Sequence, residues 1–448
     1  MTFLHWKITV AVIVIAITGG GFLSFNFLAR KSGPDDYSSP PAKIKNSPYG
    51  IYSPGTLDDV PTSAGQAMLA ALGMNSLAEY QDYSLSLVKE LGASWVRMDF
   101  IFNGWNYQEP SDYLNRIHRE GLDVLGCIRP INGSTPTNLV KFQQETQQLV
   151  SAYPWITTWQ IGNEPNLSWS NPGDFPRFFT AARKAVLTAC PSCRIALAGV
   201  AALYPGQGSP TRALTVYRRI VEEIIQDTPR GEHPFDIFDL HYYGNSGDDQ
   251  AILNSLDSYR ELLGSLGIER VTSIWVTETA TTTSQPNWPP GSPRQTEAQQ
   301  AADLIERFCT MLGAGVSRVS WARPYENFSY ANDPGNFYDH AGLVYNGMGQ
   351  EAAAGIKPGT KKEAFYAYRT MVAETAGAVA VQQLGLGDYR FTFSDGRQPV
   401  FIIWAAAGSG VPPDLTGPVT ITGIDGSKTV AEAADIKPGP LPVFVQNR

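Results

Sequence analysis

Short apolar runs alternate along this chain with longer segments in which apolar residues recur every three or four positions. The short runs have the length and composition of strands buried on both faces. Eight of them are predicted, at 49–53, 94–100, 123–129, 156–163, 194–200, 235–243, 273–277 and 318–322. Eight strands alternating with helices predict an α/β fold of the (β/α)8, or TIM barrel, type, because eight parallel strands close such a sheet.

The segments between the predicted strands have the spacing of amphipathic helices. The helix predicted at 77–91 has Asn75 and Ser76 as candidates for its cap and Gly92 just past its end. Further apolar stripes with a spacing of about 3.6 residues run through 175–189, 217–225 and 304–312. Each stripe gives its helix one apolar face, as expected for helices that pack on a barrel.

The pattern changes after a helix predicted at 361–374. Short β-branched or aromatic runs, separated by Gly, Pro, Asp and Ser, follow at 378–383, 389–393, 400–405, 418–424 and 441–445. They predict a small antiparallel β domain, which we expect to pack on the barrel because about 70 residues form a poor core alone. The predicted domains are therefore a barrel at 48–376 and a β domain at 377–448.

The N-terminal segment has the pattern of a membrane span. Residues 8–28 carry no charge over 21 positions, with Lys7 before them and Arg30 after them. This length suffices to cross hydrocarbon as a helix and exceeds the apolar region of a usual signal peptide. We predict an uncleaved transmembrane signal anchor at 1–30 and a linker at 31–47; a cleaved signal peptide is the alternative.

Charge and cysteine content narrow the function classes. The net charge is −8 and the sequence contains no basic block, so a nucleic-acid partner is not expected. Cys127 and Cys309 lie in apolar runs and are predicted core residues. Cys190 and Cys193 flank a turn and can form a local disulfide outside the cytoplasm. A redox motif would need a thioredoxin-like unit around them, and a zinc site would need two further ligands.

Two glutamates stand where apolar strands end. Glu164 ends the fourth predicted strand and Glu278 the seventh, and these strands lie across the barrel mouth from each other. An unpaired carboxylate at the edge of a core is costly to desolvate. Two such glutamates are therefore unexpected unless they have a function. If both side chains point inward, a carboxyl separation of roughly 5 Å is attainable, which suits glycosidic bond cleavage by an acid and a nucleophile.

Two other strands bring polar side chains to the same mouth. Asp239, His241 and Tyr243 share one face of the sixth strand, and Arg97 and Asp99 share one face of the second. An inward arginine needs an anion nearby. The glutamate that ends the seventh strand supplies this anion, and the arginine in turn holds that glutamate ionised.

Alternation along the seventh strand makes a further prediction about side-chain direction. Counted back by twos from Glu278, positions 276 and 274 face the barrel interior. Trp275 and Thr277 would then face the surrounding helices.

This set of residues resembles clan A of the retaining glycoside hydrolases. In that clan an Asn-Glu-Pro ends strand four with the acid/base, and a glutamate ending strand seven is the nucleophile. The chain is most similar to family 39 and its bacterial membrane-anchored endoglycosidases that cleave exopolysaccharides. The resemblance covers residues 48–448, although the loop at 279–290 does not follow a family pattern.

The resemblance implies a role for individual residues. Glu164 takes the acid/base role and Glu278 the nucleophile role. The implied substrate-binding residues are Asn163 toward a sugar 2-hydroxyl, Arg97, His241, Tyr243, Asp99, Trp105 and Trp321, the last as the aromatic platform under the reacting sugar. The loop at 323–336 is also rich in aromatic and amide side chains, which suit sugar faces and hydroxyls.

The expected protein is thus a retaining β-glycosidase, endo-acting on an extracellular polysaccharide and needing no metal or organic cofactor. We expect a monomer, anchored in the membrane with its catalytic domain outside the cytoplasm. One alternative is a non-catalytic sugar-binding barrel in polysaccharide assembly or export. Another is a metal-dependent barrel hydrolase, which the five histidines disfavour because no His-x-His pair lies on the first strand.

Overall fold

The computed structural model describes residues 47–55, 63–104, 106–107, 112–201, 210–268, 272–285, 293–326, 335–406 and 410–448. The anchor predicted at 1–30, nearly all of the linker and Trp105 lie outside the described residues. Within these ranges, no helix combines the length and apolar character that crossing a membrane requires.

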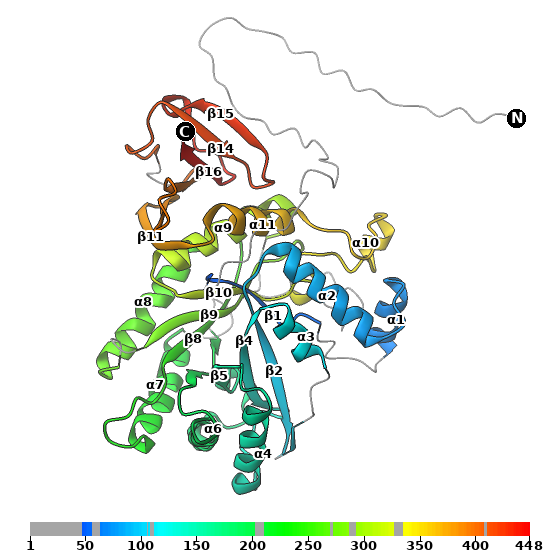
Figure 1. Ribbon diagram of the computed structural model, residues 1–448, viewed down its shortest axis with the longest axis vertical. Helices are drawn as coiled ribbons and strands as arrows, with labels where there is room; N and C mark the ends of the chain where they lie inside the picture. Colours follow the sequence, from blue (N-terminus) through cyan, green and yellow to red (C-terminus); the bar gives the residue numbers. More distant parts are fainter. Residues whose placement is uncertain are drawn as a thin grey trace, which may run out of the picture. The chain divides into compact units, whose positions relative to one another are not determined.

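Eight parallel strands form a closed barrel (Figure 1). They are β1 (Tyr49–Tyr52), β2 (Trp95–Asn103), β4 (Asp123–Pro130), β5 (Thr158–Ile161), β6 (Arg194–Leu197) with its continuation β7 (Val200–Ala201), β8 (Ile237–Tyr243), β9 (Ser273–Ala280) and β10 (Arg318–Trp321). β1 pairs with both β10 and β2, which closes the sheet. A short strand β3 (Asn106–Tyr107) folds back on the end of β2. The predicted barrel is confirmed.

The helices lie outside these strands (Figure 1). They are α1 (Ser63–Ala71), α2 (Leu77–Leu91), α3 (Tyr113–Arg119), α4 (Leu139–Ala152), α5 (Pro165–Ser168), α6 (Phe175–Ala189), α7 (Pro210–Asp227), α8 (Asp249–Ser265), α9 (Glu297–Gly313), α10 (Gln350–Ala353) and α11 (Glu363–Thr375), with 3-10 turns at Pro172–Asp174, Tyr338–His340 and Ala433–Asp435. The Ser76 side chain accepts from the Glu79 N–H at the start of α2, and Gly92 ends that helix with φ 75°. Both predicted ends of this helix are confirmed.

The barrel interior holds a small apolar layer of its own. Trp95, Leu125, Ala196, Ile237 and Trp275 form one buried cluster, contributed by β2, β4, β6, β8 and β9. The main core lies between the strands and the helices, and it includes Val276 and Ile274.

Strand β9 carries one extra residue, which corrects the predicted side-chain directions. On β8, Asp239 pairs with Trp275 of β9, and His241 pairs with Glu278. The step between these two pairs is two residues on β8 but three residues on β9. The pairing of β10 with β9 shows the same shift. Such a bulge moves the alternation by one position. The prediction that Trp275 and Thr277 face the helices is therefore wrong, since Trp275 lies in the interior cluster and the Thr277 hydroxyl donates to Asp239. Glu278 nevertheless reaches the interior.

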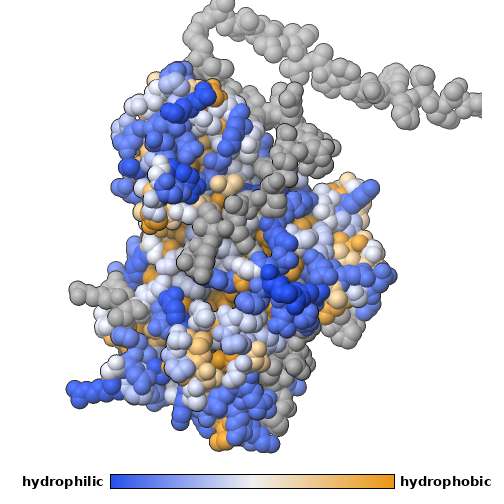
Figure 2. Space-filling model, in the orientation of Figure 1, coloured by the Kyte–Doolittle hydropathy of each residue, from blue (hydrophilic) through white to orange (hydrophobic). Residues whose placement is uncertain are grey.

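An antiparallel sheet follows the barrel, as predicted. Its strands are β11 (Ala378–Gly385), β12 (Asp388–Phe393), β13 (Val400–Ile403), β14 (Pro418–Thr422), β15 (Lys428–Glu432) and β16 (Val443–Asn447), in the order β11-β12-β13-β16-β14-β15. β15 was not predicted, because it is an edge strand with exposed positions along nearly its whole length and no apolar alternation. In Figure 2 this part of the chain is largely hydrophilic on the visible face.

The β domain packs on helix α9 of the barrel, as its small size led us to expect. The Tyr389 ring of β12 lies so close to Gly313 that a Cβ there would be 2.6 Å from it. The Tyr389 hydroxyl lies 3.3 Å from the Thr310 hydroxyl, and the ring stacks on Trp404 at 5.4 Å. Barrel and sheet belong to one compact unit.

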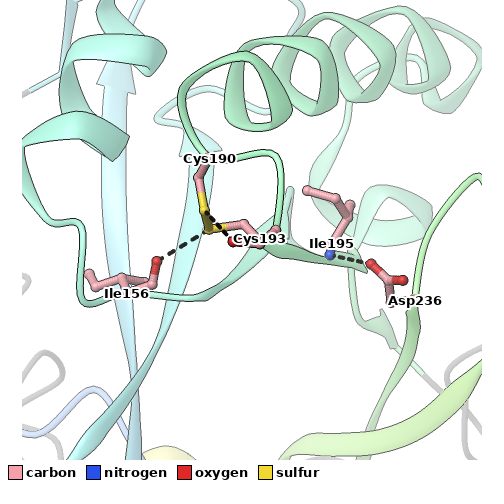
Figure 3. Close-up of a disulfide and its surroundings, with 6 residues drawn as sticks. Ile156, Cys190, Cys193, Ile195 and Asp236 are labelled. Atoms are coloured by element: carbon pink, nitrogen blue, oxygen red, sulfur yellow. Dashed lines mark hydrogen bonds between the residues drawn. A yellow bond between two sulfur atoms is a disulfide. The ribbon is translucent and has the colours of Figure 1, made fainter.

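Cys190 and Cys193 form the disulfide that the sequence allowed (Figure 3). It closes the turn between α6 and β6, next to the point where the Ile195 N–H donates to the Asp236 carboxylate at 2.7 Å. Cys127 and Cys309 are buried free thiols, as predicted.

Candidate active site

Four barrel strands bring charged side chains together at their C-terminal ends. One carboxyl oxygen of Glu164, one of Glu278 and one ring nitrogen of His241 all lie within 4.8 Å of one another. The His241 Nδ1 is 2.9 Å from Glu164 Oε1 and 3.5 Å from Glu278 Oε1. The two glutamates predicted from sequence therefore face each other across the barrel mouth.

Glu164 has an unusual backbone conformation. Its φ is 41° and its ψ is 56°, in the left-handed region that favours glycine. Its N–H donates to the Gly199 carbonyl at 3.1 Å, and its carbonyl accepts from the Ser168 N–H at 2.8 Å. Conformations of this kind typically cost about 1–3 kcal/mol and persist where surrounding contacts enforce them, often at functional sites.

Glu278 is nearly buried and is held by two donors. Arg97 Nη1 donates to its Oε1 at 2.6 Å, and the Tyr243 hydroxyl donates to its Oε2 at 2.5 Å. Burial raises the pKa of Glu278 above its usual range, against the opposing effect of the cations His241 and Arg97. The anion predicted for the inward-facing Arg97 is thus Glu278, as expected.

Arg97 is fully buried and also organises the floor of the site. Its Nη2 donates to Asn163 Oδ1 at 2.6 Å and its Nε donates to Gln160 Oε1 at 2.5 Å. The guanidinium lies 4.5 Å from the centre of the Tyr52 ring. A buried guanidinium is tolerated only with such a full set of partners, so Arg97 and its acceptors fix one another.

His241 lies between the two glutamates and a third carboxylate. Its Nε2 is 3.1 Å from Asp239 Oδ2 and 3.2 Å from Thr277 Oγ1. Burial opposes the charged ring, but Glu278 and Asp239 outweigh it and raise the pKa of His241 to about 10. Both ring nitrogens of His241 thus face carboxylate oxygens, Nδ1 toward the two glutamates and Nε2 toward Asp239.

Asp99 lies on the same face of β2 as Arg97. It accepts from Arg129 Nε at 2.7 Å and from the Tyr52 hydroxyl at 3.2 Å, and its Oδ1 is 4.0 Å from Arg97. Burial raises its pKa, but Arg129 and Arg97 lower it more, and the net pKa is below the usual range. Asp99 is thus a fixed negative charge beside the site.

Most of the predicted site residues are brought together, but Trp321 is not. Its side chain is fully buried, its Nε1–H donates to the Ala341 carbonyl at 2.9 Å, and its ring meets Phe308 of α9 edge-on at 6.5 Å. A sugar platform must be exposed when the site is empty. The structure therefore contradicts the role predicted for Trp321, and Trp105 lies outside the described part of the chain.

An aromatic that sequence reasoning missed lies at the site instead. Tyr338 is 37% exposed, and its ring lies 5.3 Å from Tyr243 at an angle of 82°. Glu164 and Glu278 both act on its hydroxyl electrostatically. The signal in the sequence was the aromatic-rich loop predicted at 323–336. The predicted loop stops two residues before Tyr338 and therefore does not include it.

A second group of buried charges supports the turn that carries Tyr338. The Lys362 ammonium pairs with Glu326 and donates to the His340 carbonyl at 3.0 Å and to the Thr283 hydroxyl at 2.9 Å. His340 Nδ1 also lies 3.4 Å from Glu351 Oε1. Because the ammonium already lies against these acidic groups, they form a fixed ion cluster rather than a metal site.

Comparison with known proteins establishes the fold. No family model and no curated protein matches the chain. Among solved structures, a family 39 glycoside hydrolase from the gut symbiont Bacteroides cellulosilyticus WH2 is similar over 91% of this chain and 83% of that one, with 15% identity and a TM-score of 0.60. A glucosidase from Croceicoccus marinus is similar over 92% and 98%, with 14% identity and a TM-score of 0.58. The predicted resemblance to family 39 is confirmed at the level of the fold.

Proposed function

We propose that this chain is a retaining β-glycosidase in which Glu164 is the acid/base and Glu278 the nucleophile. The observation that carries the proposal is the placement of the two carboxyl groups, with oxygens within 4.8 Å across the barrel mouth. Retaining enzymes separate the two groups by about 5–5.5 Å, whereas inverting enzymes leave room for a water between them. The similarity of the fold to a family 39 glycoside hydrolase supports the same assignment.

The contacts of the two glutamates suit these roles. Glu278 is aligned by Arg97 and Tyr243, so its carboxylate can attack the anomeric carbon as the leaving oxygen takes the proton of Glu164. Water then attacks the glycosyl ester, giving its proton to Glu164 and releasing Glu278. Glu164 is the more exposed of the two, with 20% of its side chain accessible, as a group that exchanges protons with the leaving group and water should be.

Asn163 and Tyr338 are the sugar contacts that we propose from the geometry. The Oδ1 of Asn163 accepts from Arg97, which leaves the amide N–H groups to donate to a sugar hydroxyl. The exposed Tyr338 ring offers an apolar face beside Tyr243, and pyranose rings stack on such faces.

The finer parts of the proposal rest on the sequence. Endo action on an extracellular polysaccharide follows from the family 39 resemblance. The charge-free residues 8–28 support a membrane-anchored protein whose catalytic domain lies outside the cytoplasm. We propose a monomer that needs no metal or organic cofactor.

A substrate panel tests this function. The wild-type protein is incubated with aryl β-glycosides and defined polysaccharides, product sizes are read by mass, and the anomer formed first is read by proton NMR. We expect hydrolysis in which the anomeric configuration is retained. The rate of hydrolysis should not change when a metal chelator is added. An inverted first product would refute the roles of the glutamates, and an oligosaccharide bound for hours without cleavage would favour the sugar-binding alternative.

Substitution of Tyr338 by alanine tests the proposed platform. We expect KM to rise by up to roughly 10-fold, since stacking on an aromatic ring contributes about 0.5–1.5 kcal/mol, with a smaller effect on kcat. Tyr338→Phe keeps the ring and should retain most of the affinity. An unchanged KM in Tyr338→Ala would exclude the platform role, and Phe337→Leu, at the buried neighbouring ring, controls for disturbance of the turn.

A further inference from the structure

Asp239 is a fully buried carboxylate directly beneath the two glutamates. It accepts from the Thr277 hydroxyl at 2.6 Å, from the Thr277 N–H at 3.0 Å and from the Gln160 side-chain amide. Its Oδ2 also faces His241 Nε2 at 3.1 Å. A buried carboxylate surrounded by donors from β5 and β9 as well as β8 is held in one orientation.

The imidazole of His241 is fixed in place as firmly as its partner. A Cβ built on Gly199 would lie 2.0 Å from His241 Nε2, so the ring packs directly on the glycine backbone. The ring faces Asp239 on one side and Glu164 and Glu278 on the other, and Arg97 and Tyr243 donate to Glu278.

The position of His241 makes it the cation that lies against three carboxyl groups at once. Arg97 and Arg129 pair with Glu278 and Asp99, and Arg323 acts on Tyr338 together with the two glutamates. The ring nitrogens of His241 lie within 3.5 Å of Glu164, Asp239 and Glu278. An imidazolium in this place compensates negative charge on each of them.

We propose that Asp239 is a positioning residue that keeps His241 permanently protonated, so that one fixed cation serves both catalytic glutamates. The kinetic part rests on the proposed function. In the first step the proton of Glu164 goes to the leaving oxygen while the negative charge of Glu278 is consumed in the new ester bond. The negative charge thus passes from Glu278 to Glu164, and the Nδ1 of His241 lies within 3.5 Å of both. No proton on the ring has to move during either step.

The protonation of His241 can be measured without any substrate. Nitrogen-15 shifts of the ring, assigned with a His241→Gln variant, are followed from pH 5 to 8.5 in the wild-type protein and in Asp239→Asn. We expect both wild-type nitrogens to stay protonated over this range, consistent with the raised pKa of about 10. In Asp239→Asn the midpoint of the His241 titration should fall by about 2 pH units or more and so lie between pH 5 and 8.5. Thr277→Val, which removes a donor but keeps the Asp239 charge, should leave the ring protonated.

The pH profile of kcat/KM supplies the second readout. In Asp239→Asn we expect a new loss of kcat/KM on the alkaline side, roughly fourfold or more at pH 8.5, whose midpoint matches that of the imidazole titration. Wild-type titration near the ordinary histidine value of about 6.5 would overturn the proposal. So would an Asp239→Asn ring that stays protonated, or a variant profile identical to the wild type. Should the variant not fold, the wild-type titration decides. If no glycoside is cleaved, the proposed function fails, while the titration still tests the locked imidazolium.

Discussion

Glutamine in place of Glu278 or Glu164 is expected to lower turnover by several orders of magnitude, roughly 10³-fold or more. Glutamine keeps the size of the side chain but can neither form the glycosyl ester nor exchange a proton. Steady-state hydrolysis of an aryl glycoside measures the loss, and circular dichroism checks the fold. Glu222→Gln, on a side chain of α7 that is 43% exposed, makes the same chemical change outside the site and should keep full activity. Near-wild-type turnover in both site variants would disprove the mechanism.

The two glutamates are distinguished by azide. With Glu164→Ala and an activated aryl glycoside, the glycosyl-enzyme still forms on Glu278, and azide should release a product of retained configuration. With Glu278→Ala, azide replaces the missing nucleophile directly and should give the inverted product. Proton NMR of the glycosyl azides separates the outcomes. One and the same product from both variants would reverse or void the assignment.

Alanine at Gly199 is the second change for which we expect a large effect, about 100-fold in kcat/KM, because a small misplacement of a positioned group costs this much. Its Cβ would overlap the His241 ring, and the neighbouring atoms are also constrained, since the Gly199 carbonyl accepts from the Glu164 N–H and from the Tyr217 hydroxyl. The ring must therefore move away from Glu164 and Asp239. The pH–rate profile and the His241 nitrogen shifts measure this displacement together.

Gly439→Ala is the matched control for this change. A Cβ on Gly439 meets nothing within 4 Å, so its stability and activity should match the wild type. If Gly199→Ala retained full kcat/KM with unaltered His241 shifts, the close packing of ring and glycine would have no catalytic importance. A loss of thermal stability without a loss of kcat/KM would likewise limit Gly199 to a role in folding.

Much of this architecture could be predicted because the responsible signals are local. Helix α2 begins and ends where Ser76 and Gly92 place its caps, and the barrel strands are continuous apolar runs bounded by turns. Glu164 and Glu278 could be paired because strands four and seven of any closed eight-stranded barrel face one another. The topology thus converted two separate sequence positions into a single site.

The parts that could not be predicted depend on pairing between segments. The bulge in β9 exists only relative to β8 and β10, so counting along one strand could not reveal that Trp275 and Thr277 point inward. Trp321 has the residue type of a platform, but its direction is set by packing on Phe308. Asp239 was placed on the correct face, yet the donors that surround it come from three different strands.

The left-handed backbone at Glu164 sets thermal stability against turnover, because a substitution that relieves the strain at this position also removes the catalytic side chain. Glycine or asparagine would occupy this conformation with less strain, and either would remove the side chain that donates the proton. Directed evolution that selects survivors of heating alone would consequently enrich inactive proteins at this position. A screen for industrial variants of this barrel therefore has to assay reaction products in every round.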